Sequence, residues 1–200
     1  MLDAIVTMDE TMVSYHTPET KKQSKQWIPR GQPGPMKARV HASRTKQMVV
    51  AFFDSRSLIY TNIVPRGASI NAAYTIKVLG TFLEHFKKKR PAMAAQQWWF
   101  HWDNAPVHTA ASVKEWMAAK GIQVLEHPPY SPDLAPADFF LFRRVKEALA
   151  GTTLDQDSLK TAWEGVVRNI TADDFATAFR RWFERAEKCV RIGGDFVEKS

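Results

Sequence analysis

The order of strand-like and helix-like patterns along this 200-residue chain constrains its fold most. Short runs rich in apolar and β-branched residues predict strands at 4–7, 11–15, 46–54, 57–64, 97–102 and 122–125. Apolar residues at helical spacing predict helices at 71–90, 107–120, 137–150, 157–169 and 171–190. Strands come first, helices and strands then alternate, and helices come last. This order predicts an α/β domain in which a mixed central sheet is flanked by helices.

The bulk composition excludes several classes of protein. With 44% hydrophobic residues the chain can bury a core of its own. Its longest apolar runs are too short to span a bilayer, so no membrane partner is expected. A single cysteine, Cys189, excludes an internal disulfide and a cysteine-based zinc cage. The net charge of +7 favours a polyanionic partner such as DNA.

Much of this positive charge falls in residues 17–44, which are rich in proline, glycine and basic side chains. Such a composition opposes both helix and central strand, and a loop of this length inside a compact domain is commonly functional. Trp27 has few apolar neighbours in this segment, so it is expected to lie at an interface, to stack on a DNA base or to pack locally. The candidate DNA contacts in this segment are Trp27, Arg30, Lys37, Arg39 and Arg44.

Three aspartates stand where a metal site would need them. Asp9 and Asp103 each follow an apolar strand, and Asp138 opens a helix after a proline-rich loop. Breaking a phosphodiester needs an activated oxygen nucleophile and a stabilised leaving oxygen, and two Mg²⁺ ions held by a few carboxylates can serve both. From spacing alone, Asp103 and Asp138 could equally cap helices, and Asp133 could be a turn former or the third ligand.

The surrounding residues closely resemble the acidic motifs of mariner transposases. The segments are IVTMDE at 5–10, HWDNAPVH at 101–108 and HPPYSPDLAPADF at 127–139, with a familial ending that includes GGDFVE at 193–198. The family places 34 residues between its second and third aspartates, which selects Asp138 over Asp133. One departure is Met8, where the family usually has glycine. A larger side chain beside the metals is expected to alter packing or rate.

This resemblance spans residues 4–198 and implies an RNase H-like catalytic domain over 1–200, as in retroviral integrases. It implies that Asp9 bridges two divalent cations, Mg²⁺ or substituting Mn²⁺, and that Asp103 and Asp138 hold one each. The segment 17–44 resembles the family's clamp loop, which reaches the partner subunit. A nuclear homodimer acting on transposon ends and TA target DNA is therefore expected. The family's N-terminal helix-turn-helix modules are absent from these residues.

Two other functions remain open on the sequence. The domain could be a metal-dependent endonuclease that cuts DNA without choosing transposon ends. It could also be a host-captured module that binds DNA or dimerises with weak catalysis, although the presence of all three aspartates argues against this.

Several other residues near the motifs have simpler interpretations. His101, His108 and His127 match no compact zinc pattern, so they are expected to position DNA or adjacent loops, with His108 as a DNA contact. Glu10 follows Asp9 directly and is expected on the opposite face of the strand, away from the metals. Tyr130 is interpreted as structural.

Overall fold

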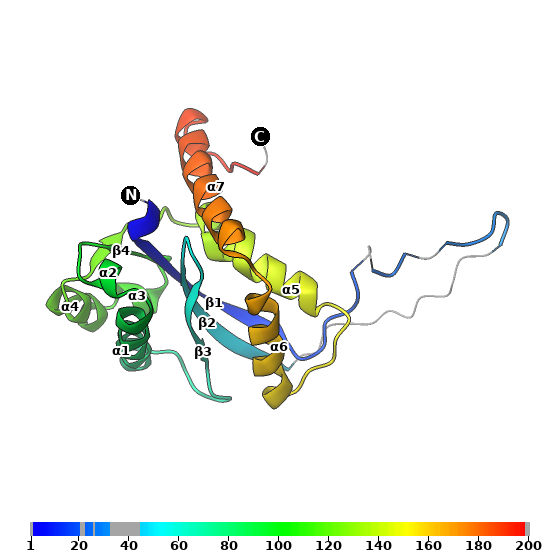
Figure 1. The fold of residues 1–200 in the computed structure, drawn as a ribbon, viewed down its shortest axis with the longest axis horizontal. Helices are drawn as coiled ribbons and strands as arrows, with labels where there is room; N and C mark the ends of the chain where they lie inside the picture. Colours follow the sequence, from blue (N-terminus) through cyan, green and yellow to red (C-terminus); the bar gives the residue numbers. More distant parts are fainter. Residues whose placement is uncertain (1, 21–22, 26, 33–44, 199–200) are drawn as a thin grey trace.

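A five-stranded mixed sheet forms the centre of the computed structural model, which describes residues 2–20, 23–25, 27–32 and 45–198 (Figure 1). The strand order is β3-β2-β1-β4-β5. β2 pairs antiparallel with β1 and β3, whereas β1, β4 and β5 run parallel. The strands are β1 (Ile5–Ser14), β2 (Lys46–Asp54), β3 (Leu58–Ile63), β4 (Trp99–His101) and β5 (Gln123–Leu125). The predicted mixed sheet is confirmed.

Helices cover both faces of this sheet. The α-helices are α1 (Ala72–Lys89), α2 (Pro91–Ala94), α3 (Pro106–Thr109), α4 (Ala111–Ala119), α5 (Arg143–Leu149), α6 (Gln156–Arg168) and α7 (Ala172–Arg191). Two 3₁₀ turns, η1 (Leu2–Ala4) and η2 (Pro132–Leu134), and a π-helix, η3 (Ala137–Phe142), complete the regular structure of the described residues. Among the described residues, no helix is both long and apolar enough to cross a membrane.

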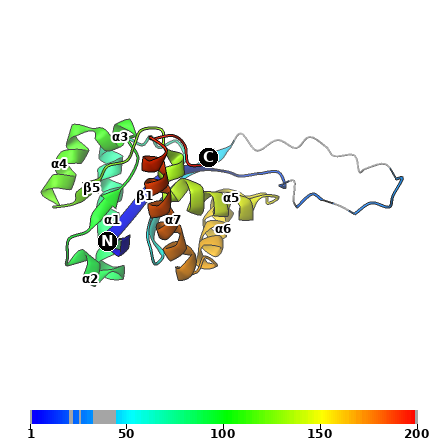
Figure 2. The same cartoon turned by 90° about the horizontal axis from the view of Figure 1, so that it is seen from above.

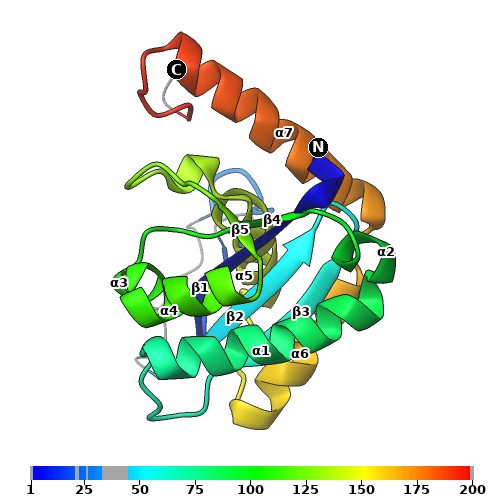
Figure 3. The same cartoon turned by 90° about the vertical axis from the view of Figure 1, so that its left-hand side faces the viewer.

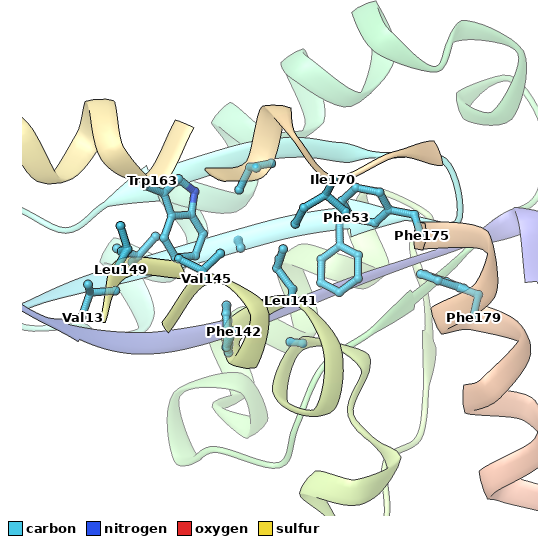
Figure 4. Packing of buried hydrophobic residues seen from close by; sticks show 14 of the residues in the cluster. Val13, Phe53, Leu141, Phe142, Val145, Leu149, Trp163, Ile170, Phe175 and Phe179 are labelled. Atoms are coloured by element: carbon cyan, nitrogen blue, oxygen red, sulfur yellow. The ribbon is translucent and has the colours of Figure 1, made fainter. Parts of the chain in front are cut away.

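Alternating side chains of β1 divide the apolar interior into two cores. Ile5 and Val13 point into the core under η3, α5, α6 and α7, which Figure 4 shows around Trp163 and Phe53. Val6 and Met8 point into the other core, under α1 and α4, the side that faces the viewer in Figure 3. We call these two sides the α5–α7 face and the α1–α4 face. The period of two in a strand therefore assigns each β1 residue to one face.

Three boundaries differ from the prediction. The two strands expected at 4–7 and 11–15 form one continuous strand, β1 (Ile5–Ser14), because Met8, Asp9 and Glu10 all pair with β2. Asp9 therefore lies inside a strand and not at its end. The predicted helix at 107–120 is split into α3 and α4, because Ala110 has an extended ψ of 137°. The strand expected at 97–102 shortens to three residues, β4.

The described parts of the segment 17–44 contain neither helix nor strand and run away from the sheet (Figures 1 and 2). The base of the segment is fixed to the body. Gly151 donates its backbone N–H to the carbonyl oxygen of Thr17 at 2.8 Å, and the Gln23 side chain donates to the carbonyl of Ala150. The start of this segment is therefore hydrogen-bonded to the body of the domain at Thr17 and Gln23.

Candidate active site

The sheet brings the three aspartates to one groove. Thr7 and His101 form the last β1–β4 pair, and Asp9 and Asp103 each lie two residues beyond it. Asp138 is the second residue of η3, which packs against β1. All three line a groove of about 610 Å³ between β1, the residues after β4 and the loop that leads to η3. The parallel pairing of β1 with β4 is what places the first two acids side by side.

The carboxylates in this groove are held close together against their own repulsion. Burial and the negative charge of Asp138 raise the pKa of Asp9 to about 8, although a hydrogen bond from the Glu10 N–H to Asp9 Oδ1 at 2.7 Å opposes the shift. Burial also raises the pKa of Asp138, against the attraction of Lys146. Raised carboxyl pKa values in a shared groove indicate a site that a cation would stabilise.

The donor set fits hard divalent cations that complete their shells elsewhere. Within the described ranges, no three His, Cys, Asp or Glu side chains converge closely enough to hold one ion by themselves. Mg²⁺ binds through one or two carboxylates and keeps several waters or substrate oxygens. Three carboxylates spread around one groove therefore suit two such ions better than one fully caged ion.

Asp103 does not cap the helix that follows it. The N-cap residue of α3 is Ala105, which makes no side-chain capping bond. Asp103 Oδ1 instead accepts from the Ala105 N–H at 3.0 Å and from His108 Nδ1 at 2.8 Å. The His108 hydrogen bond lowers the pKa of Asp103 even though burial opposes this. The carboxylate is therefore charged and held in one orientation.

His108 was predicted to contact DNA, and the structure shows that prediction to be wrong. Its side chain has 0% exposed surface and lies flat against Trp102, with ring centroids 4.4 Å apart and planes 5° apart. Its Nε2 lies 3.2 Å from Glu10 Oε1. Burial disfavours charge on the ring, but the two carboxylates outweigh it and raise the pKa of His108 to about 9. A side chain enclosed in this way hydrogen-bonds to other protein side chains and is not accessible to DNA.

Glu10 is the residue whose part in the site the sequence reasoning missed. The strand period places Glu10 on the α1–α4 face, opposite Asp9, yet Glu10 also lines the groove that contains the three aspartates, so the expectation that it lies away from the site is not confirmed. Through His108 it is nevertheless connected to Asp103. The sequence feature that could have revealed this link is the spacing of five residues between Asp103 and His108, with Pro106 between them. Proline favours the first turn of a helix, and one helical turn brings the histidine back toward the aspartate.

Met8 points away from the groove, so the expected disturbance of the metals by a large side chain finds no support. The methionine is 2% exposed and packs in the core of the α1–α4 face. Asp9 points to the other face. The departure from the family's glycine therefore fills a core and does not crowd the carboxylates.

Asp133 is engaged elsewhere in the fold. It is buried, its Oδ2 accepts the Val197 N–H at 2.8 Å, and its carbonyl oxygen accepts from Arg185 at 2.9 Å. It does not line the groove, whereas Asp138 does. The geometry thus agrees with the choice of Asp138 that the motif spacing made.

Among the other DNA candidates, Trp27 is fully exposed at 104% and Arg30 is exposed. Lys37, Arg39 and Arg44 lie outside the described residues. Tyr130 is a further candidate that sequence reasoning treated as structural. It is 93% exposed, lies in the lining of the groove and has a φ of 53°, which a non-glycine residue seldom adopts. Strained, exposed side chains of this kind are concentrated at binding sites.

His101 and His127 form a buried chain beside the groove. Thr7 Oγ1 lies 2.8 Å from His101 Nδ1, and His101 Nε2 lies 3.0 Å from His127 Nδ1. Burial, with His127 beside it, lowers the pKa of His101 to about 3. These neutral rings hydrogen-bond to protein groups, and the loop from His127 is tied to Asn104, whose amide donates to the His127 carbonyl at 2.6 Å. They position the groove's loops.

Known proteins resemble this chain over nearly all of its length. The Mariner Mos1 transposase of Drosophila mauritiana is 32% identical over 98% of this chain and 57% of its own length. The human histone-lysine N-methyltransferase SETMAR is 27% identical over 98% of this chain and 29% of its own length. The chain thus spans little more than half the length of the Mos1 relative.

Solved structures show the same fold. The crystal structure of the Mos1 mariner paired-end complex with Mn matches with a TM-score of 0.89 and 31% identity, over 98% of this chain and 57% of that one. The catalytic domain of Mos1 matches with a TM-score of 0.80 and 27% identity, over 98% and 84%. The predicted RNase H-like fold is confirmed.

A family model described as DDE superfamily endonuclease matches residues 4–160, which include all three aspartates of the groove. This match covers well over half of the chain, and the sheet, groove and acidic residues agree with it. The chain belongs to the DDE superfamily endonucleases.

Proposed function

We propose that this chain is the catalytic core of a mariner-type transposase, which cuts DNA strands and joins the freed 3′ ends to target DNA. The observation that carries the proposal is the meeting of Asp9, Asp103 and Asp138 around one groove. Similarity to Mos1, whose solved structures include paired-end complexes with Mn and with Mg, supports both DNA and divalent cations as partners.

The three carboxylates have different parts in this proposal. Two bound cations, Mg²⁺ or Mn²⁺, would stabilise the attacking and leaving oxygens of the phosphodiester. Asp9, which is the most buried of the three and interacts electrostatically with both of the others, would serve both ions. Asp103 and Asp138 would each hold one. Asp138 is partly buried but keeps exposed surface, so its carboxylate can meet DNA that enters from the open side.

The exposed residues of the segment 17–44 suggest how two copies would assemble on DNA. Trp27 and Arg30 lie beyond the body on a segment without regular structure. A fully exposed tryptophan gains most from burial against another surface. We place Trp27 at the contact with a second copy, in a homodimer that acts on nuclear DNA and inserts at TA sites. Trp27→Ser should then shift the DNA-bound dimer toward monomer in light scattering, whereas an unchanged dimer would exclude this contact.

Cleavage and joining of a labelled duplex test the proposed activity. The wild-type protein, incubated with Mg²⁺ or Mn²⁺, should give nicked and joined products that chelation by EDTA abolishes. Asp138→Asn keeps the shape of the side chain and removes its charge, so it should lose both products while unfolding at a temperature no lower than that of wild type. Cleavage at the wild-type rate in that variant would refute the three-aspartate site.

One observation favours a second candidate, a captured DNA-binding module. A protein named as a methyltransferase, SETMAR, contains a stretch similar to nearly all of this chain. The fold therefore also occurs within a protein of another named activity. DNA binding by the intact chain without metal-dependent cleavage would select this alternative, and cleavage without joining would indicate an endonuclease.

A further inference from the structure

We propose that Glu10 and His108 are positioning residues that hold the Asp103 carboxylate in the orientation needed to bind its cation. This inference rests on the proposed function, which makes Asp103 a ligand. It goes beyond the three acids because it assigns a positioning task to two residues outside the proposed ligand set. The structural basis is a continuous chain of contacts from Glu10 in β1 through His108 in α3 to Asp103, two residues after β4.

Asp103 needs such support because its own backbone gives little. It lies two residues beyond the end of β4, and its side chain is 46% exposed. An exposed aspartate can rotate among several staggered states. Both hydrogen bonds to the carboxylate fall on Oδ1, from the Ala105 N–H and from His108 Nδ1. With Oδ1 occupied in this way, Oδ2 is the oxygen presented to the groove.

His108 can impose this orientation because the fold fixes it on every side. The imidazole is fully enclosed, and its flat stacking on Trp102 sets the plane of the ring. Once the plane is set, Nδ1 and Nε2 point in opposite in-plane directions. One meets Asp103 at 2.8 Å and the other meets Glu10 at 3.2 Å. A ring with two acceptors at its two ends cannot turn over without losing both hydrogen bonds.

Glu10 supplies the fixed end of the chain. It belongs to the middle of β1, where its backbone pairs with Val50 of β2, and it follows Asp9 directly. The backbone that carries Asp9 is therefore linked through Glu10 and His108 to the carboxylate of Asp103. This connection sets the separation of the first two proposed ligands across the strand junction. Groups that orient metal ligands typically change metal affinity 10- to 100-fold when they are removed.

Binding of Mn²⁺ alone, followed by the electron paramagnetic resonance signal of the free ion, tests the inference without relying on activity. Glu10→Ala and His108→Ala should each raise the apparent Kd for Mn²⁺ by about 10-fold or more. Glu10→Gln keeps an acceptor opposite Nε2 and should lie between wild type and Glu10→Ala. Glu84→Ala, an exposed position on α1, is the matched control and should bind as wild type does.

Thermal unfolding and cleavage kinetics separate positioning from simple support of the fold. Positioning predicts that rising Mn²⁺ concentration restores much of the cleavage rate in Glu10→Ala. If the alanine variants bind Mn²⁺ like wild type and only unfold at lower temperature, the inference is overturned. If they do not fold, His108→Asn decides, since its amide can still donate to Asp103 but cannot reach Glu10. The Kd of this variant for Mn²⁺ should rise above that of wild type, and a wild-type Kd would overturn the role of Glu10.

Asp103→Asn distinguishes failure of this inference from failure of the proposed function. If wild type binds Mn²⁺, and Asp103→Asn weakens that binding while the Glu10 and His108 variants do not, only the positioning role falls. If Asp103→Asn leaves Mn²⁺ binding unchanged, Asp103 is not a ligand, and the proposed function and this inference fall together.

Discussion

Replacing Asp9 by asparagine should stabilise the metal-free protein while it removes the activity. The pKa of Asp9 is about 8 in the folded protein, because burial and the neighbouring Asp138 disfavour its charge. The unfolded chain ionises the same group near 3.9. Folding at neutral pH therefore requires Asp9 to take up a proton. Asparagine has nearly the same shape and can still accept the Glu10 N–H, so it avoids this cost.

The size of the effect follows from the pKa and depends on pH. Each pKa unit corresponds to 1.36 kcal/mol, so the cost of protonating Asp9 is about 4 kcal/mol at pH 7 and about 1.5 kcal/mol at pH 5. It vanishes below the unfolded pKa and is complete above pH 8, so wild-type stability falls as pH rises through this window. At roughly 2–4 °C per kcal/mol, the unfolding temperature of Asp9→Asn should exceed that of wild type by about 10 °C at pH 7.

Thermal unfolding at pH 5, 6, 7 and 8, with and without Mg²⁺, checks this reasoning. Mg²⁺ should raise the unfolding temperature of wild type and leave Asp9→Asn nearly unchanged, because the ion competes with the proton for Asp9. Asp157→Asn, at an exposed aspartate in α6, is the control substitution and should not gain stability as Asp9→Asn does. The argument fails if Asp9→Asn is no more stable than wild type at pH 7, or if its advantage is the same at pH 5.

Three further substitutions give independent checks. Tyr130→Ala should weaken duplex binding in fluorescence anisotropy by about 1–3 kcal/mol, with no change in unfolding temperature, because its side chain is 93% exposed beside the groove. Asp133→Ala leaves the buried Val197 N–H without its acceptor and should cost about 1–3 kcal/mol in urea unfolding. Trp163→Ala empties the centre of the α5–α7 face and should cost about 3–5 kcal/mol in the same assay. An unchanged urea midpoint in either of the last two variants would contradict the packing described.

The elements of the fold were predictable where a strong local signal agreed with the final packing. Helix 71–90 was placed within one residue at each end, since Asn71 caps α1 and Pro91 follows its basic last turn. The strands predicted at 46–54 and 57–64 also match β2 and β3 to within one residue. Boundaries failed where pairing between distant segments decides the outcome. Asp9 and Glu10 look like a turn in isolation, yet nine pairs with β2 keep β1 continuous.

The three aspartates of the site were predictable from the sequence, but the residues that hold them in position were not. The motifs and their spacing alone select Asp103 and Asp138, and the groove contains both. The link from Glu10 to Asp103 depends on where α3 turns His108, and no local pattern fixes that. For the same reason Asp133 could not be separated from Asp138 by composition. Its task, binding the Val197 N–H, involves a residue 64 positions away.

The pairing register of β1 determines the geometry of the site more than any single contact does. Asp9 faces the α5–α7 side with Asp138, and Glu10 faces the α1–α4 side with His108. A shift of one residue in strand pairing exchanges the two faces. Glu10 would then meet Asp138, and Asp9 would enter the enclosure of His108, so neither the groove nor the support of Asp103 would survive. The buried neighbours Met8 and Val13 oppose this shift, since each would leave its own core. The apolar pattern of β1 therefore holds the acidic pair in place, and weakening it at Val13 should disturb metal binding as well as stability.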